Sequence, residues 1–413
     1  MRWWPIRARR LAPPPPPDEM LVIEDRLRRN VEDVLAVRDR QVRGGVVVFR
    51  GDLTTEPSRA LDLLIDRFRP AGYTPYLREE GGLVVVQALP QTQTVVPAEP
   101  RRNVVLFSLT CITMLLAGLG FVGAPMFDAL RTAPSLVVRF FAGIPFAATL
   151  LAVLVVHEFG HYFAARYHGA SVSLPYFVPA PPPILGYLLF GLPIGVPFGT
   201  LGAIILMRSP ARDRNSLFDI AAAGPLAGLA VAFPAIVVGL GWSSVVPTPP
   251  EGYSGFGDSL LTWGLAYLRF GPIPPGHMLF THPMVDAAWA GLLVTALNLI
   301  PVGQLDGGRI VYALFGRRHR AVGRATVMAL LGLGVAAFFW TLHTPGADMA
   351  LALGSSLNWF MWAGLISLLV GLHHSPPLDD LSPLSWGRRA IGIACLILLV
   401  LMLPPFLFQI KAG

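Results

Sequence analysis

The chain has 413 residues, of which 54% are hydrophobic and only 14% are charged. Its mean hydropathy of +0.58 excludes an ordinary soluble domain and indicates a multi-pass membrane protein. The formal net charge of +7 comes almost entirely from arginine, and we attribute it to composition and membrane topology, not to a surface that binds nucleic acid. The two cysteines both lie in apolar runs, which excludes a disulfide framework and a cysteine-ligated metal.

The N-terminal quarter of the chain differs in composition from the rest. Residues 1–20 form a basic, proline-rich tail that lacks the apolar core of a signal peptide. Residues 21–97 predict a soluble α+β domain with helices and strands in the order αβαββ. The elements are a helix within 21–39, a strand at 45–49, a helix at 57–68 and a strand pair at 73–78 and 83–89. No catalytic motif occurs there, so we expect a regulatory, partner-binding or solubilising role.

From residue 101 to residue 413 the sequence predicts a membrane domain of about seven transmembrane helices. The predicted spans are 103–122, 140–166, 217–242, 285–301, 325–342, 349–372 and 391–408. The apolar stretch 184–207 is interrupted by glycine and proline, which favours a re-entrant loop or hairpin. Within this domain we expect a catalytic core at about 140–316 and C-terminal helices at 325–408.

The distribution of arginine predicts the orientation of these spans. With seven spans, most arginines near span ends fall on the side of the N-terminus, which is the cytosolic side by the positive-inside rule. We therefore expect a multi-pass protein of a bacterial plasma membrane with a cytosolic N-terminus. His157 lies nine residues before Arg166, so its depth below that helix end is roughly 14 Å.

One apolar span carries a metal-binding motif. Residues 157–161 read His-Glu-Phe-Gly-His, and positions i and i+4 of a helix share one face. The two imidazoles of His157 and His161 can therefore bind one metal ion, with Glu158 beside it. The alternative is a pair of ordinary helix histidines. Ionisable side chains are costly inside a membrane helix and usually mark a site, which favours the metal.

A second segment about 140 residues later supplies a carboxylate. Residues 298–308 read Asn-Leu-Ile-Pro-Val-Gly-Gln-Leu-Asp-Gly-Gly and follow another apolar span. Two histidines, Asp306 and an open fourth position are typical of catalytic zinc, so we predict one Zn²⁺ per chain. Zinc lowers the pKa of a water molecule toward neutrality, and Glu158 is predicted to take that proton and pass it to the leaving amide nitrogen.

Three further residues are candidates for substrate binding. Asn298 can donate a hydrogen bond to the substrate. Alternatively, it forms a hydrogen bond between two helices. Gly199 and Gly202 lie in a glycine-rich segment that can offer a strand edge to an extended peptide, or that simply shields the cavity. A substrate helix must unwind before its peptide bond reaches the metal, because each turn shields the backbone.

These residues resemble those of the site-2 protease family of intramembrane zinc metalloproteases. The resemblance covers roughly residues 140–316 and includes the segment 219–228, Asp-Ile-Ala-Ala-Ala-Gly-Pro-Leu-Ala-Gly. It implies that His157, His161 and Asp306 are zinc ligands, that Glu158 is the catalytic acid and base, and that transmembrane segments of other membrane proteins are cleaved, as in regulated intramembrane proteolysis.

Other motifs point to one branch of that family. The segments 174–179 and 198–203 are similar to those of cyanobacterial and plastid-type homologues. The interval 243–283 is too short to contain a PDZ domain, so substrate screening by such a module is not expected.

Two competing functions remain to be compared with proteolysis. A zinc peptidase that trims prenylated proteins takes its third ligand from a downstream glutamate motif, whereas this chain offers Asp306 followed by two glycines. An inactive homologue, or a metal-binding membrane scaffold or transporter, is the non-enzymatic alternative. A transporter needs polar groups along a full path, and an inactive homologue has lost a ligand or the glutamate, but all four residues are present here.

Overall fold

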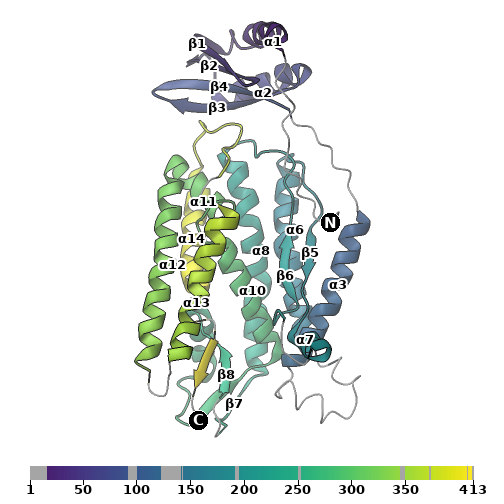
Figure 1. Ribbon diagram of the computed structural model, residues 1–413, viewed down its shortest axis with the longest axis vertical. Coiled ribbons are helices and arrows are strands. Elements are labelled where there is room, and N and C mark those ends of the chain that lie inside the picture. Colours follow the sequence, from purple (N-terminus) through teal and green to yellow (C-terminus); the bar gives the residue numbers. More distant parts are fainter. Residues whose placement is uncertain are drawn as a thin grey trace. The chain divides into compact units, whose positions relative to one another are not determined.

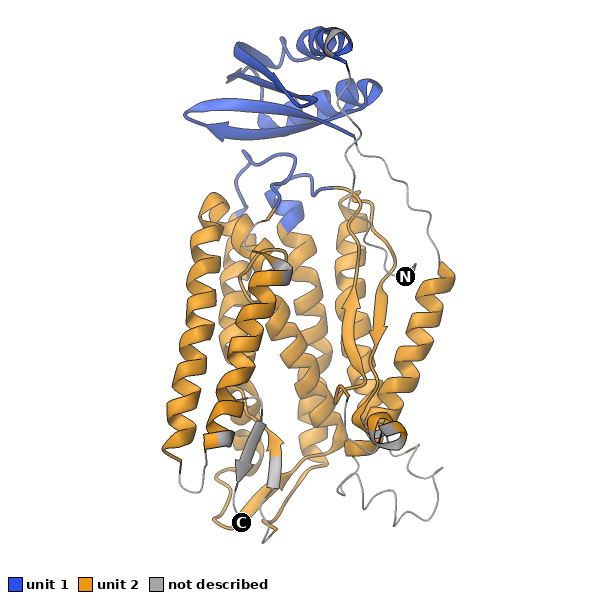
Figure 2. Ribbon diagram, in the orientation of Figure 1, with its two compact units in different colours: residues 1–98, 210–217, 375–385 blue, residues 99–209, 218–374, 386–413 orange. Residues whose placement is uncertain are grey.

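The computed structural model describes residues 16–91, 100–121, 141, 143–190, 195–249, 253–344, 349–371, 374–406 and 408–411. Most of the basic N-terminal tail therefore lies outside the described residues. The chain forms two compact units (Figure 2). Unit 1 comprises residues 1–98, 210–217 and 375–385, and unit 2 comprises residues 99–209, 218–374 and 386–413.

Unit 1 is built on a four-stranded antiparallel sheet with the strand order β1-β2-β4-β3. Its elements are α1 (Pro17–Arg29), β1 (Leu35–Arg43), β2 (Val46–Leu53), α2 (Pro57–Phe68), η1 (Arg69–Ala71), β3 (Tyr73–Glu80) and β4 (Leu83–Pro90). The core is formed by fully buried side chains from both helices and the sheet, among them Leu27, Phe49, Leu61 and Phe68. Burial of these large apolar side chains is the main stabilising contribution to the unit.

The predicted order αβαββ is wrong, since the first helix is followed by two strands. Helix α1 ends at Arg29, and β1 begins at Leu35, within the stretch predicted to be helical. Gly44 and Gly45 both have positive φ angles, 58° and 82°, and form the tight turn that joins β1 to β2. This turn requires extended chain on both sides, and it overrides the helical spacing of the apolar residues.

Unit 2 is a bundle of long apolar helices that run side by side (Figure 1). The helices are α3 (Pro100–Gly118), α6 (Ile144–Tyr167), α8 (Arg214–Gly241, whose first turn belongs to unit 1), α10 (Pro283–Leu299), α11 (Asp306–Phe315), α12 (His319–Leu342), α13 (Met349–Leu365) and α14 (Trp386–Met402). Short helical segments extend some of these elements: η2 (Leu119–Phe121), η3 (Gly316–Arg318) and the π-helix η4 (Ile366–Val370).

Five stretches of the described chain are long and apolar enough to cross a membrane. They are Pro100–Phe121, Ile144–Tyr167, Arg214–Gly241, Asp306–Leu342 and Leu351–Leu368. Helices α10 and α14 are shorter, with 17 residues each. The chain is thus a multi-pass α-helical membrane protein with a small N-terminal α+β sheet unit.

Short strands and helices connect the long helices of unit 2. They are β5 (Tyr176–Pro179), α7 (Pro183–Phe190), β6 (Thr200–Ile204), β7 (Ser244–Pro247), β8 (Tyr253–Phe256), α9 (Leu260–Phe270), β9 (His277–Phe280) and β10 (Phe408–Lys411). Strands β5 and β6 are antiparallel partners, so the interrupted stretch 184–207 contains a short helix and a strand. Helix α14 ends at Met402, before the predicted end at residue 408, because Pro404 and Pro405 cannot continue it.

Helices α6 and α10 pack together around the core of unit 2. Phe146, Leu150 and Leu154 of α6 and Ala287 and Ala290 of α10 are buried in one apolar cluster. The small residues of α10 allow its backbone to approach α6 closely. This packing places the end of α10, and the segment that follows it, beside the second half of α6.

Candidate metal centre

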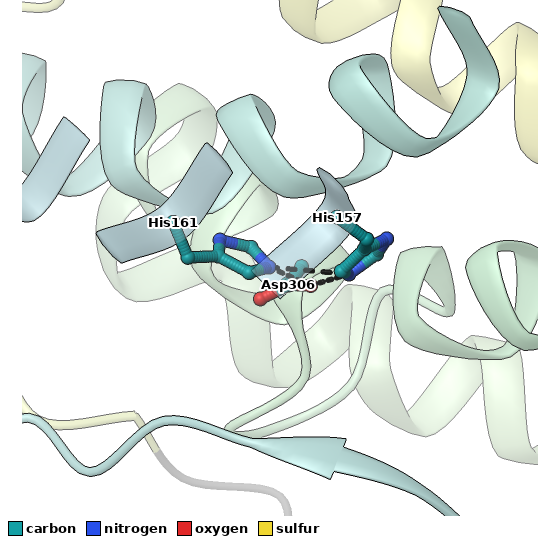
Figure 3. Close-up of side chains that lie close together, drawn as sticks. All are labelled: His157, His161 and Asp306. Carbon is teal, nitrogen blue, oxygen red and sulfur yellow. Dashed lines mark hydrogen bonds and ion pairs between the residues drawn. The ribbon is translucent and has the colours of Figure 1, made fainter. Parts of the chain in front are cut away.

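Three buried side chains converge on one point in unit 2 (Figure 3). The Nε2 atoms of His157 and His161 are 3.2 Å apart, and Asp306 Oδ2 lies 3.0 Å from His161 Nε2 and 3.7 Å from His157 Nε2. Tetrahedral zinc with bonds near 2.0–2.1 Å requires donor atoms about 3.3 Å apart. The three residues are only 2%, 4% and 9% exposed. Their number, chemistry and spacing fit a zinc ion with one open coordination position.

Helix α6 presents the two imidazoles. His157 and His161 are one turn apart, and their ring centroids are 5.0 Å apart. Their face of α6 is buried within the bundle, while Val156 and Phe163 on other faces are exposed. The ionisable side chains that this apolar helix buries are the two histidines and Glu158, and all three lie at that site.

Asp306 is delivered by a sharp break between two helices. Helix α10 ends at Leu299, the chain turns through Gly303 with φ 52°, and α11 begins at Asp306 itself. A Cβ atom on Gly307 would overlap the carbonyl oxygen of Leu299, and one on Gly308 would lie 2.5 Å from the carbonyl oxygen of Gly303. The two glycines are therefore required for the turn that carries the carboxylate to the histidines.

Charged groups surround the three donors. Glu158 is 5% exposed and interacts electrostatically with His157, His161 and Asp306. Arg309, one turn after Asp306 on α11, places Nη1 3.9 Å from Asp306 Oδ1. The two oxygens of Asp306 thus face different partners, since Oδ2 points to the imidazoles and Oδ1 to the guanidinium.

The three candidate substrate-binding residues occupy different places. Asn298 Nδ2 lies 3.3 Å from His157 Nε2, so this amide borders the centre. Gly199 packs on α3, where its carbonyl oxygen accepts a 2.6 Å hydrogen bond from the Thr113 hydroxyl. Gly202 lies in β6 with φ 98°, and a Cβ atom there would meet no neighbour within 4 Å. The structure therefore brings Asn298 to the donors and places both glycines at strand β6.

Several contacts at the centre were not predicted from the sequence. The Ile220 carbonyl on α8 accepts a 2.6 Å hydrogen bond from His161 Nδ1, and Gly224 leaves room for the same ring. The segment 219–228 carries part of the family resemblance, but no residue type in it marked this hydrogen-bond partner. Arg309 had a detectable signal, because a cation one turn after a buried carboxylate on a helix often pairs with it.

The comparison with known families identifies the region that contains the centre. Residues 145–342 match the model of peptidase family M50, the site-2 protease family. The chain contains a peptidase family M50 domain. The resemblance found in the sequence is confirmed, and this domain includes both histidines, Glu158 and Asp306.

Plant proteins are among the relatives of the chain. The chain is 28% identical over 395 residues to a protein named probable zinc metalloprotease EGY2, chloroplastic, from Oryza sativa subsp. indica, covering 91% of this chain and 64% of that protein. It is 32% identical over 272 residues to probable zinc metalloprotease EGY1, chloroplastic, from Oryza sativa subsp. japonica, covering 64% and 41%. It is 34% identical over 211 residues to the EGY2 protein of Arabidopsis thaliana, covering 48% and 34%.

The chain therefore spans less than two thirds of the length of these relatives. The relatives are of the plastid type expected from the sequence. No solved structure matches the chain.

Proposed function

We propose that the protein is a zinc metalloendopeptidase that hydrolyses peptide bonds within or near transmembrane segments of membrane proteins. The observation that carries this proposal is the convergence of His157, His161 and Asp306 beside Glu158 within apolar helices. The names of the relatives, which describe zinc metalloproteases, support the same activity.

In this proposal each residue of the centre has a distinct role. His157, His161 and Asp306 hold Zn²⁺, which when bound acts as a Lewis acid on water and on the substrate carbonyl. Glu158 removes the proton from the attacking water and returns it to the leaving nitrogen. Asn298 donates a hydrogen bond to the substrate carbonyl oxygen, because its amide borders the donors.

The proposed substrates are membrane proteins with transmembrane helices, presented as extended chain. Strand β6, which contains Gly202 and follows Gly199, would pair with the unwound segment. Leu201 and Ile204 of β6 are 69% and 49% exposed, so this strand offers apolar contacts to such a chain. The lipid bilayer is the second partner, and nucleic acid is not one.

We extend the proposal to the topology and the division of the chain. The membrane domain comprises seven spans, counting α10 and α14, and a re-entrant segment at 184–207. The chain is divided into a soluble domain at 21–97, a catalytic core at about 140–316 and C-terminal helices at 325–408. The arginine distribution supports a cytosolic N-terminus in a bacterial plasma membrane, whereas the matched relatives are named chloroplastic. Labelling of single cysteines introduced in β2 and in the loop before α10 tests the orientation.

The decisive experiment compares the wild-type protein with Glu158→Gln and His157→Ala. The wild type should contain about one zinc per chain and cleave a single-span membrane protein. Glu158→Gln should retain zinc but lose cleavage by about 100- to 10,000-fold, because the general base is absent. His157→Ala should lose both. Elemental analysis and gel-based cleavage assays measure the two effects, and undiminished cleavage by Glu158→Gln contradicts the proposal.

A further inference from the structure

Helix α8 supplies the hydrogen-bond acceptor that orients one of the candidate metal ligands. His161 Nδ1 lies 2.6 Å from the carbonyl oxygen of Ile220, and the donor in this bond is the ring N–H. The other ring nitrogen, Nε2, then carries the lone pair and lies 3.0 Å from Asp306 Oδ2. The position of Ile220 therefore determines both the tautomer and the direction of this imidazole.

The contact between α6 and α8 leaves no space for adjustment at this point. A Cβ atom on Gly224 of α8 would overlap His161 Nε2, and one on Gly160 of α6 would lie 2.7 Å from the Ala223 carbonyl oxygen. A Cβ atom on Gly228 would lie 3.2 Å from His157 Nδ1. A small shift of α8 along α6 thus moves the metal-binding rings.

The residue before Ile220 ties α8 to two other elements. Asp219 accepts two hydrogen bonds from Arg388 on α14, from Nε and from Nη2, each 2.7 Å long. Its Oδ2 atom also lies 2.8 Å from Nε2 of His168, the residue that caps the C-terminal end of α6. One carboxylate thus connects α6, α8 and α14; we call Asp219, Arg388 and His168 the Asp219 clamp.

The geometry of the clamp favours a positioning role. A bidentate arginine–carboxylate pair fixes orientation as well as distance, which a single lysine contact does not. The three side chains are only 26%, 34% and 20% exposed, so water screens them less than a surface pair. On the apolar helix α8, Asp219 directly precedes Ile220, whose carbonyl accepts the hydrogen bond from His161. A change in the position of Asp219 is therefore passed on to the His161 ring.

We propose that the Asp219 clamp positions the carbonyl of Ile220 and thereby sets the orientation and zinc affinity of His161. This inference rests on the proposed zinc site. Asp219 is a positioning residue, since it acts on the centre through Ile220 and does not touch the three donors. Its carboxylate holds the register of α8 on α6, and Arg388 and His168 are its two anchors.

The test measures zinc affinity of the full-length, detergent-purified protein by competition with a chelator. Asp219→Asn should bind zinc about 10- to 100-fold more weakly than the wild type, as is usual for loss of a group that supports a ligand. The visible absorption spectrum of the Co²⁺-loaded protein should shift, because the ligand geometry changes. Asp219→Glu, which retains the charge, should recover part of the affinity.

The matched control is Asp33→Asn in unit 1. Asp33 also accepts two hydrogen bonds from one arginine, Arg67, so the change removes a second bidentate pair, more exposed and far along the chain from the centre. Zinc affinity and the Co²⁺ spectrum should equal those of the wild type. If Asp219→Asn fails to fold, Arg388→Lys replaces it, and the same weakening and spectral shift are expected.

The outcomes separate the two proposals. Wild-type zinc affinity and an unchanged Co²⁺ spectrum in folded Asp219→Asn or Arg388→Lys overturn the role of the clamp and leave the zinc site standing. Equal zinc binding by the wild type and by His161→Ala overturns the zinc site itself, and with it the inference.

Discussion

At the scale of single residues, the carboxylate of Asp306 combines two contacts. Oδ2 faces the two imidazoles, and Oδ1 lies 3.9 Å from Arg309 Nη1. The guanidinium stabilises negative charge on a side chain that is 11% exposed and reduces the cost of its burial. A carboxylate whose second oxygen is occupied in this way favours metal binding through one oxygen only.

Replacing Asp306 by asparagine should remove zinc while preserving side-chain volume. The neutral amide is a poorer ligand and leaves Arg309 without its counter-charge, so zinc affinity should fall by more than about 100-fold. Chelator competition measures this, and elemental analysis should find less than one zinc per chain. The matched control is Asp286→Asn, which alters a partly buried carboxylate on α10, hydrogen-bonded to Thr281, and should leave zinc binding unchanged. Full zinc retention by Asp306→Asn contradicts its role as a ligand.

The sequence alone predicted which side chains lie together at the candidate metal centre, but it did not predict the groups that support them. His157, Glu158, His161 and Asp306 lie in short motifs with local spacing rules, so their residue types alone indicate a metal. The acceptor for His161 is a backbone carbonyl, which every residue has, and no residue type marks it. Arg388 is 169 positions from Asp219, and only the packing of α14 beside α8 brings the pair together.

At the scale of elements, the centre depends on how closely α6 and α8 approach. The contact uses glycines on both helices, since Gly160 faces Ala223 and Gly224 faces His161. Lipid tails are as apolar as helix side chains, so the hydrophobic effect does not drive helices together within a membrane. Helix association there relies on close packing of this kind. The small residues of the segment 224–228 permit close packing, but residue type alone does not show that the side chain packed against Gly224 is a candidate metal ligand.

Gly224→Ala should therefore damage the centre more than any other glycine replacement on α8. The added methyl group would overlap His161 Nε2, so either α8 moves or the ring turns, with a cost of about 1–3 kcal/mol in stability. Zinc affinity, measured by chelator competition, should fall at least about tenfold. Gly241→Ala at the end of the same helix is the control, because a Cβ atom there meets nothing within 4 Å. Equal zinc affinities in the two variants would show that α8 does not constrain the ring.

At the scale of the whole molecule, unit 1 is assembled from three separate stretches of chain. The edge strand β3 bonds to residues after α13, since the Leu77 amide donates to the Leu378 carbonyl at 2.7 Å and the Asp380 amide donates to the Leu77 carbonyl at 3.0 Å. Leu378 and Leu381 pack against the core of the unit. Pattern reading predicted the sheet but assigned its domain to 21–97, because a short segment 300 residues away has no strand signal of its own.

The side chain of Asp379 fixes the turn of this added segment, so Asp379→Ala should loosen the segment at the edge of the sheet. The side chain is 1% exposed, and Oδ1 accepts hydrogen bonds from the amides of Leu381 and Ser382 at 2.9 and 3.0 Å. Leaving these donors without an acceptor costs about 1–3 kcal/mol, which corresponds to roughly 5- to 150-fold faster local opening. Hydrogen–deuterium exchange at the amides of Leu77 and Asp380 measures that opening.

The control for Asp379→Ala is Asp52→Ala, which removes an exposed ion pair with Arg38 from the opposite edge of the same sheet. Its effect should remain below about 1 kcal/mol, because solvent screens a pair whose side chains are 50% and 65% exposed. Zinc content should be unchanged in both variants, since neither residue belongs to the M50 domain. The Leu77 amide of Asp379→Ala could instead exchange as slowly as that of the wild type. That result would mean that the segment 375–385 stays on the sheet without this carboxylate.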